Sequence, residues 1–286
     1  MTPRSPSRPP VRRAIAAPLA AGTLLIAATA LDAHDFWIIP DAFQVSADST
    51  IHANGRSGTR FPAGSAVQPT RVADARLIGA GSEMRITDMS VQGSSLRLSQ
   101  KPASAGQYLI VVGLTPRATR STPTGLLRFL RAEGGADEAA RLEREGLLAG
   151  QDSLVFHSAS YAATIVQYGR GGPRAFELNA GQPLQFVPLA DPLQAHVGDT
   201  LHVRITGAGK PLGNTGVLSS GTIDSTVADV VAPTLRLTTD ASGVVHIPLT
   251  KAGLWNIRAT HVGRRAGTAN EWDVARATYV FNVGSH

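Results

Sequence analysis

The chain has 286 residues, a formal net charge of +6, 43% hydrophobic residues and no cysteine. The lack of cysteine excludes a disulfide framework and a lipid anchor on cysteine, so a hydrophobic core must supply the stability. Four arginines and one aspartate in residues 1–33 account for half of the net charge, which leaves +3 on the rest of the chain. That excess is not gathered into a basic patch with aromatic residues, so we expect no nucleic-acid partner.

Residues 1–33 predict a secretory signal peptide. The arginines come first, the stretch Ala14–Ala30 is apolar and rich in alanine, and small residues follow. The apolar stretch is short and is soon followed by polar residues, so we expect no stable membrane span after processing. Such a leader directs export, and we expect the mature protein in the periplasm.

The place of cleavage decides the chemistry of His34. A cut after Ala33 would make His34 the first residue, whereas a cut after Ala30 would leave Leu31 first. An N-terminal histidine can bind one metal ion with its free amine and its Nδ1 together, and the amine is accessible because its pKa is roughly 7.7–8.0. Nitrogen donors of this kind suit Cu(II), Ni(II) and Zn(II). His34 is therefore the first candidate metal ligand.

The sequence after the leader predicts strands interrupted by one helical region. From Phe36 to about Leu114, short apolar stretches alternate with glycine, serine, aspartate and proline, as in an antiparallel sandwich. Between residues 123 and 148 the apolar spacing becomes helical, with a break at Gly134-Gly135, which predicts two short helices. Strand-like sequence returns over residues 156–168.

A second run of strands starts near Gly181. Residues 201–205 and 245–249 alternate apolar and polar side chains, and turn residues separate the strands at the short spacing of an immunoglobulin-like sandwich. We therefore expect a mainly β protein of two antiparallel β-sandwich (immunoglobulin-like) domains. The first covers residues 34–180, with the helical insertion at about 123–148, and the second covers residues 181–286.

Several short motifs follow one another in an order that resembles a known family. The first, Ala33-His34-Asp35-Phe36-Trp37, matches the start of the family's mature chains. The others are, in chain order, Ser160-Tyr161-Ala162, residues 183–192, Gly209-Lys210-Pro211-Leu212, Asp240 with Gly243, Gly253-Leu254-Trp255 and Thr260-His261. The chain resembles a family of bacterial periplasmic proteins classed as a domain of unknown function, some members of which are assigned to nickel or cobalt uptake.

The resemblance implies a periplasmic protein linked to metal uptake, and two positions depart from the family pattern. The family often has glutamate where Gln185 stands and lysine where Ala163 stands. We therefore expect no role here that needs a charge at either position.

Among the internal histidines, His261 is the best candidate for a second metal ligand. Side chains alternate along a strand, so Trp255, Ile257 and His261 share one face and His261 lies at the rim of the core. A hydrogen-bonded histidine at the core edge is the competing interpretation. By the same alternation, His202 and His246 face solvent.

Four further residues are candidate metal ligands, or groups that orient a ligating side chain by a hydrogen bond. They are Asp35, next to His34; His157, at the start of the returning strand; and Glu271 and Asp273, which flank Trp272 in an expected loop. We name no catalytic residue, because no Gly-x-Ser-x-Gly, His-Glu-x-x-His or paired-carboxylate pattern is present.

These observations favour a non-catalytic periplasmic protein that binds nickel, cobalt or copper for uptake or buffering, with a membrane metal importer as its partner. A second hypothesis is a copper-dependent oxidative enzyme with an N-terminal histidine clasp. The aromatic content of 5% is small for the flat substrate face of such an enzyme. A third hypothesis is a structural or adhesive envelope protein in which His34 has no metal role.

Overall fold

The computed structural model describes Met1, residues 34–222 and residues 235–285. Apart from Met1, the described residues belong to one compact unit. The predicted leader, apart from Met1, lies outside the described residues. Within the described part of the chain, no helix combines the length and apolar character needed to cross a membrane.

The largest sheet, called here the large sheet, has ten strands in the described residues. Its order is β16, β15, β18, β19, β11, β9, β5 and β6, and β10 and β2 pair with β11. The bounds are β2 Gln44–Val45, β5 Val72–Gly79, β6 Ser82–Arg85, β9 Gly106–Leu114, β10 Arg117–Ser121, β11 Leu154–Tyr168, β15 Gly216–Thr222, β16 Leu235–Thr238, β18 Gly253–Arg264 and β19 Glu271–Val283.

Two smaller sheets accompany the large one. The N-terminal sheet contains β1 (Asp35–Pro40), β3 (Ile51–Arg60), β4 (Ala63–Ala66), β7 (Asp88–Gln92) and β8 (Ser95–Gln100). The C-terminal sheet contains β12 (Leu184–Pro188), β13 (Thr200–Gly207), β14 (Lys210–Pro211) and β17 (Val244–Pro248). Short 3-10 turns lie at Pro69–Arg71 and Pro192–Gln194.

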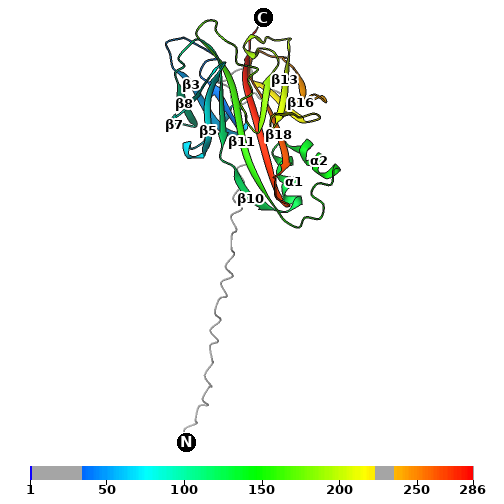
Figure 1. Ribbon diagram of the computed structural model, residues 1–286. Coiled ribbons are helices and arrows are strands. Elements are labelled where there is room, and N and C mark those ends of the chain that lie inside the picture. The colour runs from blue at the N-terminus through cyan, green and yellow to red at the C-terminus, as the bar shows by residue number, and fades with distance from the viewer. Residues whose placement is uncertain (2–33, 223–234, 286) are drawn as a thin grey trace. The chain divides into compact units, whose positions relative to one another are not determined.

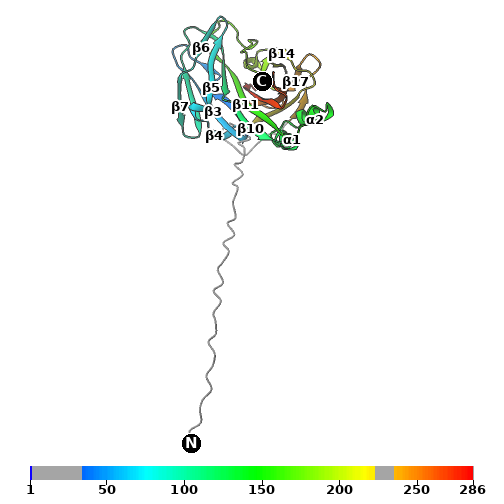
Figure 2. The same ribbon diagram turned by 60° about the horizontal axis from the view of Figure 1, so that its bottom comes forward.

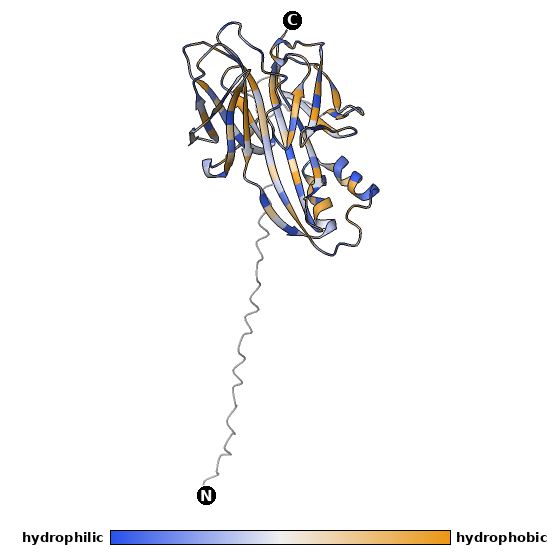
Figure 3. Ribbon diagram, viewed as in Figure 1, coloured by the Kyte–Doolittle hydropathy of each residue, from blue (hydrophilic) through white to orange (hydrophobic). Residues whose placement is uncertain are grey.

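The smaller sheets cover opposite faces of the large sheet (Figure 1, Figure 2). Alternation along β9 shows this, because Ile110 packs in one cluster with Phe36 and Leu96, whereas its neighbour Val111 packs in another with Val203. We call these faces the N-face and the C-face after the sheets that cover them. Figure 3 shows the alternation of hydrophobic and hydrophilic residues along the strands.

Two short helices form the predicted insertion, α1 over Pro123–Ala132 and α2 over Ala136–Arg144. Thr122 caps α1 by accepting a hydrogen bond from the Gly125 amide at 3.1 Å, and Pro123 fits the first turn. Gly134 ends the first helix region with a φ of 78°, which favours glycine. The apolar sides of both helices pack on the N-face of the large sheet in one cluster with Phe156, Val262, Trp272 and Val274.

The fold class expected from the sequence is confirmed: the protein is mainly β, its sheets are largely antiparallel, and the two helices are short insertions. The boundary expected between residues 180 and 181 does not divide the structure into two independent sandwiches, because the large sheet contains strands from both sides of that boundary. Instead, β11 from the first half pairs with β19 from the second half, and the pairing is parallel. The two sandwiches therefore share the large sheet as a common layer.

Glutamine side chains form hydrogen bonds with the segment that connects the two halves of the chain. Gln107 accepts a hydrogen bond from the Ala175 amide at 3.1 Å. Gln185, which is buried, accepts one from the Ala180 amide at 3.0 Å and donates one to the Leu178 carbonyl at 3.1 Å. An amide can donate and accept at once, whereas an ionised carboxylate only accepts. Glutamine at position 185 therefore suits this contact better than glutamate would.

Trp255 anchors the core between the large sheet and the C-terminal sheet. It is 2% exposed, stacks on Phe281 with ring centroids 6.3 Å apart, and donates a hydrogen bond from Nε1 to the Lys251 carbonyl at 2.9 Å. We predict that Trp255→Ala lowers the free energy of unfolding by about 3–5 kcal/mol, as loss of a buried aromatic generally does. Denaturant unfolding measures the change. Leu189→Ala, at a residue that is 42% exposed, is the control, and equal effects of the two variants would contradict the packing described.

Candidate functional site

Most of the predicted site residues lie at one end of the large sheet. There β18 ends while β11 and β19 begin, as the pairs Val155 with Glu271 and Val262 with Val274 show. Helices α1 and α2 cover the N-face at this end. The candidate residues divide between the two faces, and each face is described in turn.

The N-face carries the start of the first strand. The Thr278 hydroxyl of β19 donates a hydrogen bond to the Phe36 carbonyl at 2.5 Å, which fixes β1 over this face. Asp35 is 8% exposed and forms an ion pair with Arg258 of β18. His34 directly precedes this fixed strand and is half-buried, and its Nδ1 is fully buried without a hydrogen-bond partner. A buried polar nitrogen without a partner is costly, so it identifies a place where a ligand would be favourable.

A second acid–base pair lies on the same face. Arg276 of β19 contacts Glu133, the residue after α1, at 3.1 Å, and donates a hydrogen bond to the Ser160 hydroxyl at 3.1 Å. Burial raises the pKa of Glu133 to about 7, and the charge of Asp35 adds to this effect while Arg276 and Arg258 oppose it. The N-face cluster therefore couples Asp35, Glu133 and two arginines beneath the helices.

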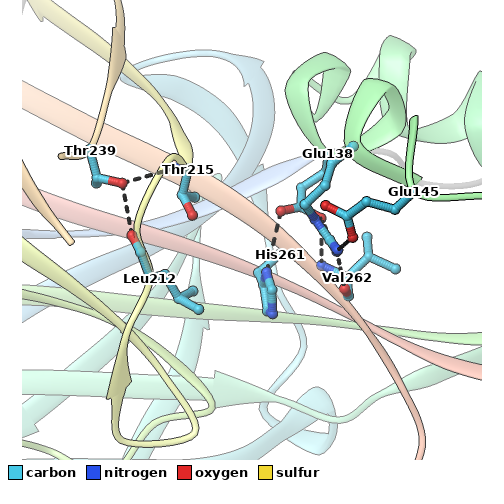
Figure 4. A network of polar contacts seen from close by, with 8 residues as sticks. Glu138, Glu145, Leu212, Thr215, Thr239, His261 and Val262 are labelled. Atoms are coloured by element: carbon cyan, nitrogen blue, oxygen red, sulfur yellow. Dashed lines mark hydrogen bonds and ion pairs between the residues drawn. The ribbon is translucent and has the colours of Figure 1, made fainter. Parts of the chain in front are cut away.

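The C-face carries His261. Its neighbours Thr260 and Val262 lie on the N-face, because Val262 packs with the helices, so alternation places the His261 side chain on the other side. Its Nδ1 lies 3.3 Å from the Glu138 carboxylate of α2 (Figure 4). This arrangement agrees with the competing interpretation, in which His261 is a hydrogen-bonded histidine at the edge of the core.

Glu138 and Arg141 also complete the exposed edge of β18. The neighbouring strand β15 pairs with β18 only as far as Ala259, so the backbone at Val262 lacks a strand partner on that side. The Glu138 carboxylate accepts from the Val262 amide at 3.2 Å, and Arg141 donates to the Val262 carbonyl at 2.6 Å. Helix α2 thus provides with side chains the hydrogen bonds that a strand would otherwise provide.

Charges set the ionisation of Glu138. Burial acts to raise its pKa, but hydrogen bonds and positive charge from His261 and Arg141 outweigh burial and bring the pKa below its usual range. Glu138 is therefore held as a carboxylate, in contrast to Glu133.

Three further candidates lie on the C-face. His157 Nε2 is 2.9 Å from the Glu271 carboxylate, and Arg265 lies 3.8 Å from both Glu271 and Asp273. His157 is opposite Asp273 across the β11–β19 pair, whereas His261 lies beyond β19 and two residues along. Strand spacings then separate the Cα atoms of the two histidines by about 12 Å. Each imidazole instead has its own carboxylate partner.

The structure therefore does not bring His34 and His261 together. His34 precedes a strand on the N-face, and His261 projects from the C-face with Glu138 as its partner. Among the described residues, no group of three or more histidine, cysteine, aspartate or glutamate side chains could hold a metal ion. The expected role of His261 as a second ligand to an ion on His34 gains no support from this geometry, since the sheet lies between them.

The sequence patterns did not reveal the charged groups that organise this end of the sheet. They are Glu133, Glu138 and Arg276, whose side chains are buried, and Arg258, whose side chain is partly exposed. One signal was available, because Arg258 stands between Ile257 and Ala259, and Arg276 stands between two alanines. Another was the spacing of Glu138, Arg141 and Glu145, which is that of helical ion pairs.

A polar cavity of about 190 Å³ lies beside α2. Its lining is Asp137, Glu138, Ala140, Arg141, Arg144, Asn214, Gly216 and Thr238. Asp137 approaches Gly216 so closely that any side chain at position 216 would collide with its carboxylate. A larger residue at the start of β15 would therefore require the Asp137 side chain to move.

We predict that Glu138→Gln destabilises the protein by about 1–3 kcal/mol at pH 7, because the amide loses the charge-assisted bonds to Arg141 and His261. The pKa of Glu138 is lowered in the fold, so its contribution is present above the unfolded value and is lost as the pH falls through the folded value. Thermal midpoints at several pH values test this. Glu145→Gln, at a more exposed partner of Arg141, should change little, and a pH-independent effect of Glu138→Gln would contradict the assignment.

We predict the opposite pH dependence for Glu133. Because its pKa is raised to about 7, its favourable contribution is full below the unfolded value near 4.5 and is lost as the pH rises through 7. Glu133→Gln mimics the neutral form, so its stability relative to the parent should increase between pH 4.5 and 8. Parallel unfolding curves for parent and variant over this range would refute a buried, neutral-preferring Glu133.

Comparison with known proteins gives a family but no function. None of the curated proteins matches this chain. Solved structures similar to it include the D0-D1 domain of Intimin, with 13% identity over 86% of this chain and 97% of that chain and a TM-score of 0.19. Murine CEACAM1b has 10% identity over 88% of this chain and 100% of that chain, with a TM-score of 0.20.

A third similar structure is Salmonella alpha-2-macroglobulin reacted with methylamine, with 10% identity, a TM-score of 0.25 and 86% of this chain covered. The chain spans only 15% of that protein. TM-scores this low support no conclusion about activity. The family match is extensive by contrast, and it covers residues 31–263. The chain belongs to the family described as Domain of unknown function (DUF4198).

Proposed function

We propose that this protein binds a divalent transition metal, nickel, cobalt or copper, through His34 in the periplasm. The observation that carries the proposal is the Nδ1 of His34, which is buried without a hydrogen-bond partner directly before the first strand. The signal-like composition of residues 1–33 supports export and removal of that segment. Cleavage after Ala33 would then add a free amine beside the unpartnered imidazole nitrogen.

The first strand would hold this chelate in place. Phe36 and Trp37 are each 1% exposed, and Asp35 is paired with Arg258. These contacts fix the backbone that follows His34, so little conformational freedom is lost when an ion binds. Asp35 and Glu133 already have arginine partners, so the donors in this proposal are the amine and Nδ1 of His34, with water completing the coordination.

A site with open coordination positions suits binding and release rather than permanent storage. The ion is cargo in this proposal. The protein would pass it to a membrane metal importer or would buffer its concentration. Copper would bind more tightly than nickel or cobalt at such nitrogen donors, so the identity of the metal in the cell would depend on supply and geometry. His261 is not required, because it lies on the other face of the large sheet.

We predict that blocking the amine removes this site. Intact mass of the exported protein first establishes whether His34 is the first residue. Titration calorimetry with Cu(II) and Ni(II) should then show one equivalent that is lost both in His34→Ala and in a chain with a methionine placed before His34. His261→Ala is the matched control and should retain that equivalent. Affinity should also fall with acid, because protons compete for the same nitrogens.

Two results would overturn the proposal. One is a mature chain that starts at Leu31, because the His34 amine would then be in a peptide bond. The other is metal binding that does not change when the amine is blocked in a correctly processed chain.

A further inference from the structure

The outer surface of the C-terminal sheet carries two histidines side by side. Strands β13 and β17 are antiparallel, and His202 is directly opposite His246 in their register. The neighbours Val203 and Val245 point into the core and are buried, so both histidines point outward, and both are exposed. β13 lies between β12 and β17, which holds the pair on a hydrogen-bonded backbone.

The two imidazole rings contact each other through their Nδ1 atoms. Their Nδ1 atoms are 2.8 Å apart, and the ring centroids are 4.6 Å apart with an angle of 88° between the planes. At this distance one Nδ1 donates a proton and the other accepts it. Two imidazolium ions would repel each other, so the contact requires that at least one ring be neutral. A neutral imidazole nitrogen is the form that binds metal ions.

The spacing of the nitrogens matches that of two ligands on one metal ion. Metal–nitrogen distances of about 2.0–2.1 Å place two ligand nitrogens about 2.9 Å apart at a right angle and about 3.3 Å apart in a tetrahedron. The observed 2.8 Å is close to the right-angle value, which occurs between adjacent positions of square-planar or tetragonal sites. Cu(II) and Ni(II) prefer such geometry with nitrogen and oxygen ligands.

A carboxylate near the pair adds negative potential. Asp240 accepts hydrogen bonds from the Val244 amide at 2.9 Å and the Ser242 amide at 2.8 Å. These bonds hold the pKa of Asp240 below its usual value, and the charge of His246 acts in the same direction. Asp240 is therefore ionised close to His246, where a cation is favoured.

We propose that His202 and His246 form a second metal site, in which their two Nδ1 atoms bind one Cu(II) or Ni(II) ion and water fills the remaining positions. Both rings would turn so that their lone pairs point at the ion rather than at each other, and the ion takes the place of the shared proton. The site needs no cleavage of the chain and does not depend on His34. Because both rings are exposed, an ion on this pair can enter from solvent and pass to another ligand.

The test isolates this pair from the chelate proposed at His34. Cu(II) and Ni(II) are titrated by calorimetry into the chain that carries His34→Ala, and Cu(II) is also followed by electron paramagnetic resonance. We expect one equivalent of Cu(II) with couplings from two imidazole nitrogens. His202→Gln and His246→Gln should each weaken binding about tenfold or more, and the double variant should show little further loss, because one imidazole alone is a weak ligand.

His52→Gln is the matched control. His52 is on a strand, but serine rather than histidine stands opposite it, and its Nδ1 is 3.1 Å from the Ser99 hydroxyl. The His52→Gln substitution should leave the Cu(II) titration unchanged. Because His202 and His246 are exposed, the variants should keep the parent's thermal midpoint without metal. Cu(II) affinity that survives in the double variant, or a spectrum without imidazole couplings, would overturn the proposal whatever the result at His34.

Discussion

The parallel pairing of β11 with β19 is the contact on which the rest of the structure depends. It extends from the pair Val155 with Glu271 to the pair Thr164 with Val280, and it joins segments more than a hundred residues apart. Away from the end that carries His157 and Glu271, both strands are covered on their two faces and bury apolar side chains on both, such as Ile165 and Val166 of β11. Non-local pairing of this kind is slow to form in general, because the entropy of loop closure is lost before the contacts are gained. The two sandwiches therefore depend on one another through these two strands.

Burial at the end of this pair explains the placement of charge. Arg258 and Arg276 point to the N-face, where the first strand and the helical insertion bury Arg276 and leave Arg258 only partly exposed. A buried guanidinium without a partner is strongly unfavourable, so each arginine needs an acid from another element. Asp35 comes from the first strand and Glu133 from the break between α1 and α2. The helical insertion thus contributes an apolar side for packing, the Glu133 carboxyl group that contacts Arg276, and the Glu138 carboxylate that caps the edge of β18.

Much of the fold follows from local patterns, whereas its pairing does not. Alternation over residues 201–205 predicted a strand with His202 outward, and helical spacing over residues 123–148 with a break at Gly134-Gly135 predicted two helices. A strongly apolar strand such as β11 has the same sequence pattern whether its neighbour is parallel or antiparallel. Its partner is decided by packing between distant segments, so the shared sheet could not be predicted.

Within the candidate site, the sequence allowed prediction only of a residue whose own position in the chain is informative. His34 was identified from the leader that precedes it, a feature of sequence order. The roles of Glu133 and Glu138 depend on where the helices dock, and from the sequence alone both resemble solvated charges on a helix. The contact between His202 and His246 depends on the register of β13 with β17. A shift of this register by two residues would keep both facing solvent and yet separate them.

The layers of the fold also constrain how metal binding at the two proposed sites can be related. His34 lies on the N-face of the large sheet, whereas His202 and His246 lie on the outer surface of the C-terminal sheet, which covers the C-face. Two packed layers therefore separate the sites, and they share no residue. Coupling between them would require an element with two arrangements that both ions bias. The intervening strands are hydrogen-bonded within their sheets, and no such element is found among the described residues, so we expect the binding energies at the two sites to add independently.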